Sequence, residues 1–403
     1  MILATLLGSA LGIISGIIPG LHSNTFASLL VSFSALLALY FSPPEICALI
    51  ITSAIAYTIA NIIPAIFLGI PSEDTAIGIL PSHRMVLEGR GFEALTISCF
   101  ASLLAIFLSL PLFLTTIFVA KNYTLLRELT PFVLISIAVL LVMSEKRGEF
   151  EGELSAWRKR LYAALVFLLS GFLGLVALSN SQLAEITPAG TVLFPMLTGL
   201  FGAPVLLLSA FGRNANMPKQ IRSICYPNFL ATIRGSIAGF FVSIFPGISS
   251  GVATVLASLG ERRNENYIAA MSSANTANAI LCFFMFLTTE RVRSGAVSAL
   301  KSLNLSPSFS EIAALSVIAG ILSFAATISI GFLLAIKLSS IDVKKMSIAT
   351  FVFLFSLVFA FTGFFGLAVF LSSIPIGLST AFLGVKRVNC MGCLILPLII
   401  WYI

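Results

Sequence analysis

The chain has 403 residues, of which 58% are hydrophobic and 10% charged, and its mean hydropathy is +1.07. This composition excludes a water-soluble globular protein, whose surface needs far more polar residues. The formal net charge of +7 comes from basic residues scattered among short loops, which is typical of topology control in a membrane protein rather than of a nucleic-acid-binding face. We therefore expect an all-α, polytopic protein of the cell membrane with no nucleic-acid partner.

Long apolar stretches recur along the whole chain, for example at 94–120, 161–178, 312–336 and 347–371. Each is long enough to cross about 30 Å of hydrocarbon, and together they predict roughly 10–12 transmembrane or re-entrant helices. The first residues, MILATLLGSALG, carry no basic segment and no clear cleavage site. We therefore interpret them as a retained first helix rather than a signal peptide.

An apolar helix with glycines four apart runs into a Pro-Gly pair twice in this chain. The first copy is GSALGIISGIIPGLHSNT from Gly8, and the second is GSIAGFFVSIFPGISSGV from Gly235. Proline removes a backbone donor and glycine relaxes the backbone, so each pair should end one helix and begin another. Two such copies predict an internal duplication with interrupted membrane helices, as in many secondary transporters.

A weaker correspondence has a different offset. The segment TIANIIPAIFLGIPSED from Thr58 aligns with TANAILCFFMFLTTER from Thr276 if a residue slips near the start. Asn61 then matches Asn278, and Glu73 matches Glu290, both at the same interval along the chain. This second match favours the same duplication with a shorter connection in the second half.

These repeats predict a four-part organisation. A first membrane repeat covers 1–144, a polar cytoplasmic linker 145–160, connecting transmembrane helices 161–226, and a second membrane repeat 227–403. If the linker is cytoplasmic and the chain alternates sides outward from it, most basic residues lie inside. The first Pro-Gly hairpin then lies outside and the second inside, so we expect inverted repeats.

The polar residues around each break are the candidate substrate site. Free backbone N–H groups and the positive dipole end at a restarting helix favour an anion, and hydroxyl or amide side chains add neutral donors. Asparagines within apolar helices also need polar partners. The predicted substrate-binding residues are Pro19, Gly20, His22, Ser23, Asn24, Thr25, Asn61, Pro246, Gly247, Ser249, Ser250, Asn275 and Asn278. The alternative interpretation is that small residues simply let membrane helices pack closely.

A second polar signal lies in GIPSEDTAIGILPSHRMVLEGRG from Gly69. Glu73 and Asp74 stand against a predicted helix end, where an acidic group can bind a coupling proton or cation. The alternative for this segment is a solvated loop whose charges set topology. Soluble catalysis has no signature here, because the chain lacks a nucleotide-cradling glycine loop, a GxSxG motif and a metal cluster. We expect no enzyme activity, no cofactor and no metal.

The order of these motifs resembles a known family. GIISGIIPGLHSNTFASLL followed by AIFLGIPSEDTAIGILPSHRMVLEGRGFEAL is similar to the large membrane subunit of tripartite tricarboxylate transporters, and IFPGISSG, SSANTAN and LFPMLTGLFG follow the same plan. This resemblance implies a permease with a small membrane subunit and an extracytoplasmic binding protein as partners. The chain departs from the family pattern in being shorter, in LTTERVRSG, which replaces a Gly-x-Pro-Gly turn, and in SHRM, which replaces Gly-Tyr-Pro-Met.

IFPGISSG also resembles the PGVSGG motif of a family implicated in moving polyprenyl phosphate lipid carriers. Our leading hypothesis is a permease that moves a small carboxylate anion by alternating access, coupled to proton or sodium. One alternative is a translocase for a polyprenyl phosphate carrier, and another is a membrane scaffold whose small residues serve packing alone. The expected ligands are thus a small anion or a phospholipid carrier, in contact with membrane lipids.

Overall fold

The computed structural model describes residues 1–18, 30–31, 33–69, 75, 79–145, 153–184, 186, 191–211, 218–245, 250–258, 261, 263–338 and 342–402. Within these ranges, eight helices are long and apolar enough to cross a membrane, and three shorter apolar helices accompany them. The prediction of an all-α, polytopic membrane protein is confirmed. The chain divides into two compact units, of residues 1–122 with 213–346 and of residues 123–212 with 347–403.

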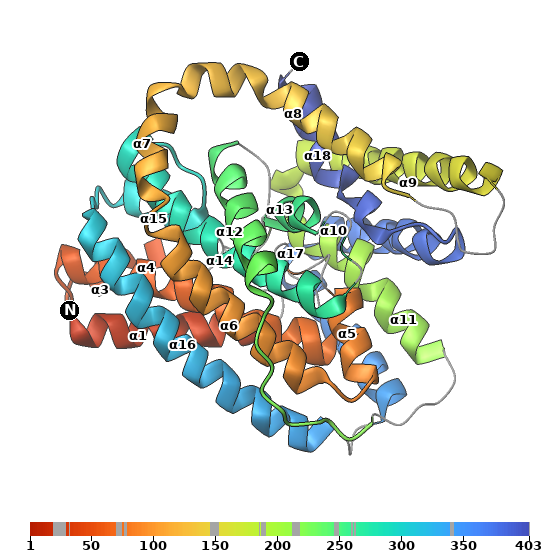
Figure 1. The fold of residues 1–403 in the computed structure, drawn as a ribbon, viewed down its shortest axis with the longest axis horizontal. Helices are drawn as coiled ribbons and strands as arrows, with labels where there is room; N and C mark the ends of the chain where they lie inside the picture. Colours follow the sequence, from red (N-terminus) through yellow and green to blue (C-terminus); the bar gives the residue numbers. More distant parts are fainter. Residues whose placement is uncertain are drawn as a thin grey trace. The chain divides into compact units, whose positions relative to one another are not determined.

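The first unit contains two matching sets of helices (Figure 1). The first set is α1 (Ile2–Ile17), α3 (Ser34–Leu37), α4 (Pro43–Ala60) with a π-turn η1 (Pro64–Leu68), α5 (Ile79–Leu87), α6 (Gly91–Ser109) and α7 (Phe113–Lys121). The second set is α12 (Phe229–Ile244), α13 (Ser250–Ala257), α14 (Asn264–Thr289), α15 (Gly295–Ser302) and α16 (Phe309–Leu338). We take α1, α4, α5 and α6 as the counterparts of α12, α14, α15 and α16.

Local sequence explains the bounds of α4. It begins with a capping box in which Glu45 Oε2 accepts from the backbone N–H of Ser42, 3.0 Å away, and Pro43 occupies the first helical position, where a missing N–H costs nothing. It ends, after the π-turn, at Gly69 in the left-handed conformation with φ 65°. Its counterpart α14 ends at Glu290, also left-handed with φ 54°.

The two sets pack on each other in swapped pairs. In each half, the helix with the left-handed end packs on the last long helix of the other half: α4 contacts α16, and α14 contacts α6. The interrupted helices contact the same partners, since α1 contacts α16 and α12 contacts α6. The short helices behave alike, since α5 contacts α14 and α15 contacts α4. Such reciprocal pairing is what a two-fold relation between the halves requires. The duplication predicted from the Pro-Gly motif therefore has a structural counterpart within this unit.

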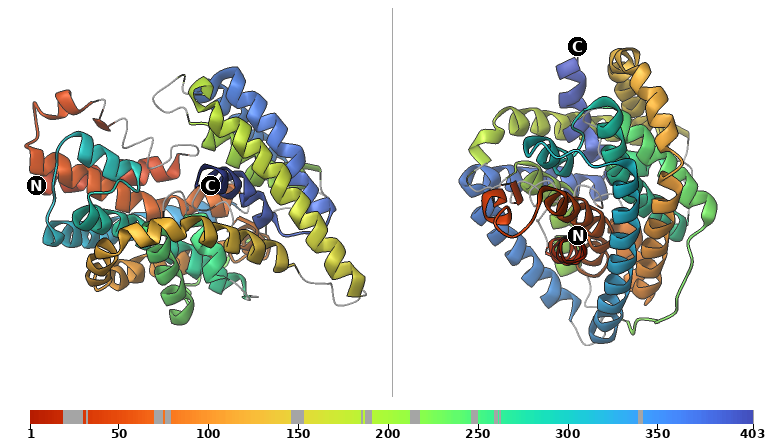
Figure 2. Two further views of the ribbon diagram at one scale, coloured as in Figure 1. Left: turned by 90° about the horizontal axis from the view of Figure 1, so that it is seen from above. Right: turned by 90° about the vertical axis from the view of Figure 1, so that its left-hand side faces the viewer.

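Helices α6 and α16 lie side by side (Figures 1 and 2) and run in opposite directions. Phe92 of α6 packs on Phe332 of α16 with ring centroids 5.7 Å apart, and Phe100 packs on Phe324 at 4.9 Å. Phe113, the first residue of α7, packs on Phe309 at 4.5 Å. Because the partner number falls as the residue number rises, these equivalent helices are antiparallel. Antiparallel equivalents are the expected geometry of an inverted repeat.

The second unit contains α8 (Tyr123–Met143), α9 (Glu153–Ser179), η3 (Ser181–Ala184), α10 (Leu193–Leu197), the π-turn η4 (Thr198–Gly202), α11 (Ala203–Phe211), most of α17 (Val343–Phe382), η5 (Arg387–Met391) and α18 (Gly392–Tyr402). Helix α17 breaks at Gly363, with φ 60° and ψ −153°, so the apolar stretch at 347–371 is not one continuous helix.

Part of the predicted linker 145–160 lies among the described residues. Its last portion, 153–160, opens helix α9. Glu145 is buried, and its Oε1 accepts from the backbone N–H of Lys386 and from Asn389 Nδ2, both at 2.8 Å. Residues 146–152 lie outside the described part of the chain. The boundaries of the four predicted parts remain predictions.

Candidate functional site

Both interrupted helices end at the same point relative to their prolines. Helix α1 ends at Ile17, and Ile18 is extended with φ −77° and ψ 113°. Helix α12 ends at Ile244, and Phe245 is extended with φ −85° and ψ 127°. A residue before proline is driven out of the helical region by the pyrrolidine ring. The predicted end of the first helix at each Pro-Gly pair is therefore confirmed.

Most predicted site residues come directly after these ends. Pro19, Gly20, His22, Ser23, Asn24, Thr25, Glu73, Asp74, Pro246, Gly247 and Ser249 lie outside the described residues. Their roles stay predictions. The predicted residues that are described are Asn61, Ser250, Asn275 and Asn278.

The glycines of each interrupted helix set its distance from the next helix. A Cβ added at Gly8 would collide with Thr52 Oγ1, and one added at Gly235 would collide with Ser273 Oγ. Thr52 and Ser273 are therefore equivalent positions in α4 and α14. The number of residues between them equals the number between Gly69 and Glu290, at which the two helices end. The packing thus matches Glu290 to Gly69, about one helical turn away from the match to Glu73 in the sequence alignment.

A buried polar cluster, which we call the polar centre, lies where the two halves of this unit meet. It consists of Thr58, Asn61, Ser98, Ser272, Asn275 and Thr276. The hydroxyls of Thr58 and Thr276 are 3.1 Å apart, and those of Ser98 and Ser272 are 2.7 Å apart. A narrow pocket, which in this conformation has no room for a water between the described residues, is lined by all of these except Thr276, together with Ile62, Thr75 and Met271.

Two of the predicted asparagines belong to the polar centre. Asn275 Nδ2 donates to the backbone carbonyl of Thr58 at 3.4 Å, across the two halves. Asn61 is 3% exposed, and its Nδ2 has no hydrogen-bond partner among the described residues. An unpaired buried amide costs about 1–3 kcal/mol, so Asn61 Nδ2 is the donor in this pocket that an added acceptor would stabilise.

The other two described residues do not line this pocket. Asn278 is half-buried, accepts from Cys282 Sγ at 3.7 Å and packs against Gly239 of α12. Ser250 is buried at the start of α13, where its carbonyl accepts the hydroxyl of Thr254 at 2.9 Å. The structure thus brings Asn61 and Asn275 to one pocket and does not place Asn278 there.

Sequence reasoning missed several members of this site. Thr58, Ser98, Ser272 and Thr276 are small hydroxyl residues within apolar helices, a pattern too common in membrane helices to single them out. Arg293, interpreted as a loop charge, donates from Nη2 to the backbone carbonyl of Ile244 at 2.6 Å. A guanidinium therefore lies beside the second helix break.

Comparison with known proteins places the chain in a family. The model of the tripartite tricarboxylate transporter TctA family matches residues 2–392. The chain belongs to the TctA family. An uncharacterized protein of Methanocaldococcus jannaschii is 27% identical over 421 residues, with 100% of this chain and 99% of that protein covered. No solved structure matches this chain. The chain is therefore a multi-pass membrane protein of a transporter family whose members work within tripartite systems.

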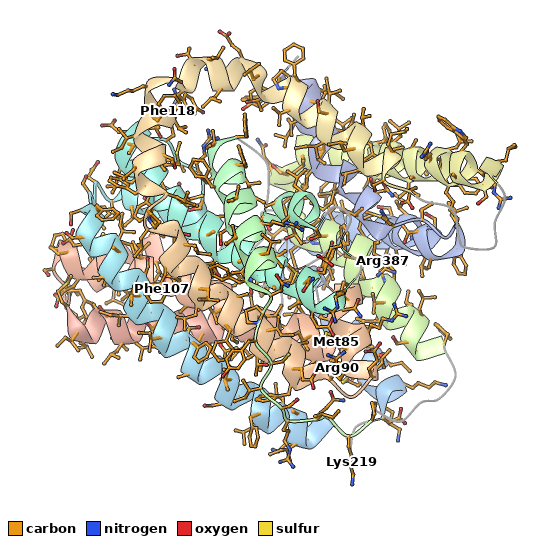
Figure 3. The ribbon with its side chains drawn as sticks, in the orientation of Figure 1. Met85, Arg90, Phe107, Phe118, Lys219 and Arg387 are labelled. Atoms are coloured by element: carbon orange, nitrogen blue, oxygen red, sulfur yellow. The ribbon has the colours of Figure 1, made fainter. Side chains whose placement is uncertain are left out.

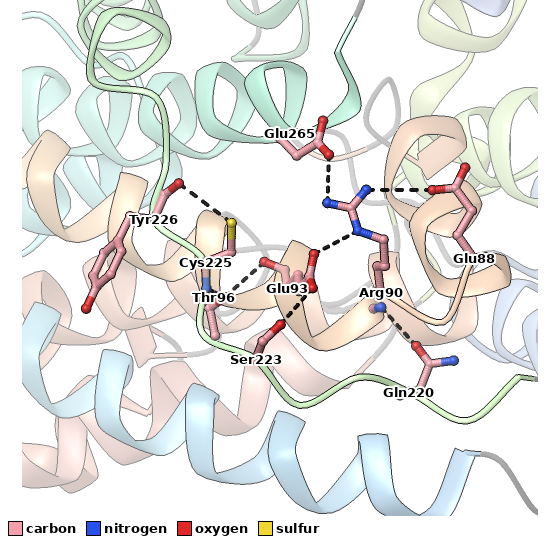
Figure 4. A network of polar contacts seen from close by, with 10 residues as sticks. Glu88, Arg90, Glu93, Thr96, Gln220, Ser223, Cys225, Tyr226 and Glu265 are labelled. Atoms are coloured by element: carbon pink, nitrogen blue, oxygen red, sulfur yellow. Dashed lines mark hydrogen bonds and ion pairs between the residues drawn. The ribbon is translucent and has the colours of Figure 1, made fainter.

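This TctA chain also joins its two halves by a surface network (Figure 4). Arg90 Nε donates to Glu93 Oε2, and Arg90 Nη2 to Glu265 Oε1, both at 2.8 Å. The hydrogen bond to Glu265 is the largest of the effects that raise the pKa of Arg90, while burial acts against it. We call the Arg90–Glu265 pair the clamp, since it connects the start of α6 in the first half to that of α14 in the second.

An extended segment, Pro218–Asn228, crosses the same surface. Gln220 Oε1 accepts from the backbone N–H of Gly91 at 2.9 Å, and Gln220 Nε2 donates to the carbonyl of Val86 at 3.0 Å. The backbone N–H of Cys225 donates to Thr96 Oγ1 at 3.0 Å. Arg90 lies at the turn between α5 and α6 and Lys219 on the extended segment (Figure 3). The segment that leads into the second half is therefore held by the first.

His83 in α5 is a buried titratable group. Neither ring nitrogen has a well-formed hydrogen bond among the described residues. Burial lowers the pKa of His83, and the nearby carbonyl of Ile66 opposes this to a smaller extent. Burial therefore favours the neutral ring of His83 over the imidazolium.

Proposed function

We propose that this TctA-family protein is a permease that moves a small organic carboxylate across the cell membrane by alternating access, coupled to proton or sodium. The observation that carries the proposal is the polar centre, with the unpaired amide of Asn61, between two antiparallel halves. Transporters built from inverted repeats bind substrate near the bilayer midplane at the repeat interface.

The chemistry of the polar centre suits a carboxylate. Amide and hydroxyl groups can donate to both carboxylate oxygens without fixing a full charge inside the membrane. Asn61 supplies an N–H that is otherwise desolvated without compensation, so a ligand oxygen there would recover about 1–3 kcal/mol. We propose that Ser23, Asn24, Thr25, Ser249 and Ser250, after the helix breaks, complete the same site, with Arg293 adding positive charge beside the second break.

The two-fold relation supports a mechanism for alternating access. If one half can exchange conformation with the other, a centre between them opens first to one side and then to the other. The helices that would slide are α4, α6, α14 and α16, whose mutual contacts connect the halves. We propose that Glu73 or Asp74 binds the coupling proton or sodium, and that a small membrane subunit and an extracytoplasmic binding protein deliver substrate.

The test of cargo is uptake by proteoliposomes that contain the purified chain. We expect labelled di- or tricarboxylates to accumulate under an imposed proton or sodium gradient, and collapse of that gradient to abolish accumulation. A polyprenyl phosphate flipping assay on the same preparation is the competing measurement. Flipping without carboxylate uptake would replace our proposal with the lipid-carrier alternative, and silence in both assays would favour a scaffold.

A further inference from the structure

The turn before α16 repeats the turn before α6. In the first half, the backbone amides of residues 88, 89 and 90 donate to the carbonyls of residues 84, 86 and 85, respectively. In the second half, the amides of residues 303, 304 and 305 donate to the carbonyls of residues 299, 301 and 300 in the same pattern. Gly89 and Asn304 adopt the left-handed conformation at matching positions, with φ 80° and 53°. These turns are therefore equivalent, and Arg90 corresponds to Leu305 within them.

The two helices that follow also begin alike. The amide of Ala94 donates to the carbonyl of Arg90, and the amide of Ile312 donates to the carbonyl of Ser308, both at 3.1 Å. In the first half Arg90 both ends the turn and begins the helix, whereas in the second half Leu305 ends the turn and Ser308 begins the helix. The connection between turn and helix is therefore longer in the second half. Glu93 and Glu311 are thus equivalent acids in the first turn. Glu93 binds the guanidinium of Arg90, whereas Glu311 Oε2 accepts from the backbone N–H and hydroxyl of Ser308 at 2.7 and 2.9 Å.

A cavity of about 210 Å³ opens at the second turn. It is lined by Met1, Pro43, Pro44, Cys47, Asn304, Leu305, Ser306, Pro307, Glu311 and Leu315. Arg90 is the counterpart of Leu305 in the turn. Glu265 is the counterpart of Pro44 at the interval that matches Thr52 of α4 to Ser273 of α14. Arg90 and Glu265 are the two partners of the clamp. The cavity therefore occupies the position at which the first half holds an ion pair.

The charge that lines the cavity favours a cation. Glu311 is the charged side chain among the residues that line it. The hydrogen bonds that Glu311 accepts from Ser308 both end on Oε2, and these neutral donors leave the negative charge of the carboxylate without a cation. A water takes about 30 Å³ in the liquid, so this cavity has the size of a side chain rather than of one water or a bare ion.

We propose that this cavity binds a guanidinium group, which contacts the Glu311 carboxylate in the way that the Arg90 guanidinium contacts the Glu93 carboxylate. A planar guanidinium can donate two parallel N–H bonds to one carboxylate, which an ammonium cannot match. The group comes either from a free guanidino solute or from an arginine of a partner protein. Because the halves are antiparallel, this site lies on the face opposite the clamp.

Binding to the purified full-length protein, followed by ligand-observed NMR, tests this site. The probe is N-acetyl-L-argininamide, and its neutral isostere N-acetyl-L-citrullinamide is the control ligand. We expect saturable binding of the first and at least tenfold weaker binding of the second. A capped pentapeptide, acetyl-Ala-Ala-Arg-Ala-Ala-amide, distinguishes the sources. Binding at least tenfold tighter than that of the single residue indicates a partner segment, and equal or weaker binding indicates a solute.

Variants locate the bound group. Glu311→Gln keeps the helix cap but removes the charge, and should weaken argininamide binding at least tenfold. Ser306→Trp should abolish binding by filling the cavity. Glu128→Gln, an exposed acid in α8, is the matched control and should leave binding unchanged. The proposal is overturned if neither arginine ligand binds, if citrullinamide binds equally well, or if Glu311→Gln and Ser306→Trp bind as the unmodified protein does.

Discussion

Single residues decide how closely the interrupted helices approach their neighbours. Gly8 and Gly12 of α1 lie against α4, and Gly235 and Gly239 of α12 lie against α14, without room for a Cβ. Small residues that allow close backbone approach are a main source of helix association in membranes. The stability of the first unit should therefore be most sensitive at these positions.

Replacement of Gly235 by Ala should destabilise the protein by about 1–3 kcal/mol through overpacking, because the added methyl meets Ser273 Oγ and the carbonyl of Ala270. Thermal unfolding in detergent measures the effect. Ile237→Ala, on an exposed face of the same helix, is the control and should stay within about 0.5 kcal/mol. Equal effects for the two variants would contradict the packing described here.

His83 predicts a pH dependence. Since burial lowers its pKa from 6.5, the unfolded chain binds a proton at a higher pH than the folded one does. Stability should therefore be full above about pH 6.5 and fall as the pH drops below that value. His83→Gln should remove this part of the slope between pH 7.5 and 5.5. A variant with an unchanged slope would show that His83 does not titrate as described.

Residue types in the sequence were enough to locate the glycines and the breaks, because Gly and Pro act through local backbone geometry. Asn61 and Asn275 could be singled out because an amide is rare in an apolar helix. Thr58, Ser98 and Ser272 could not, since their role depends on which helix faces them. The alignment matched Asn61 to Asn278 because both are asparagines. The contacts of Gly8 and Gly235 give a different interval between equivalent residues of α4 and α14, which the sequence alone does not reveal.

At the scale of elements, the two halves are held together on one face by the clamp and the extended segment. Side chains of the clamp are about a third exposed, 32% for Arg90 and 30% for Glu265, so solvent weakens their attraction. The sequence left open whether the charges around Arg90 are functional or set topology. It did not indicate that Arg90 connects the halves, because its partner Glu265 lies far away along the chain, in the second half.

A double-mutant cycle measures the clamp. We expect Arg90→Gln and Glu265→Gln to be coupled by about 0.5–1 kcal/mol in free energy of unfolding. Arg90→Lys should recover less than half of this, because an ammonium cannot hold Glu93 and Glu265 in one fork. High salt should reduce the coupling. Strictly additive effects would mean that the pair does not connect the halves.

For the whole molecule, the fold class and the duplication could be predicted from composition and the repeated Pro-Gly motif. Inversion could be predicted only through a count of membrane crossings. The structure provides independent evidence in the antiparallel contact of α6 with α16. The division into two units was not predicted, because each unit combines segments that lie far apart in the chain.

Cysteine cross-linking tests this inversion. In a background without native cysteines, we expect the pairs Phe100→Cys with Phe324→Cys, and Phe92→Cys with Phe332→Cys, to join with a short thiol reagent. The exchanged pairs, 92 with 324 and 100 with 332, are displaced by about two helical turns, or about 12 Å along a helix, and should not join. Efficient linking of the exchanged pairs alone would indicate parallel helices.

The most direct test of the polar centre is gradient-driven carboxylate uptake by Asn61→Leu proteoliposomes. We expect at least a tenfold loss of uptake with normal folding, because the leucine removes the unpaired amide donor from the pocket. Thr327→Val, which alters a buried hydroxyl in α16 outside that pocket, should transport as the unmodified protein does. Uptake by Asn61→Leu equal to that of the unmodified protein would contradict a role for Asn61 in substrate binding.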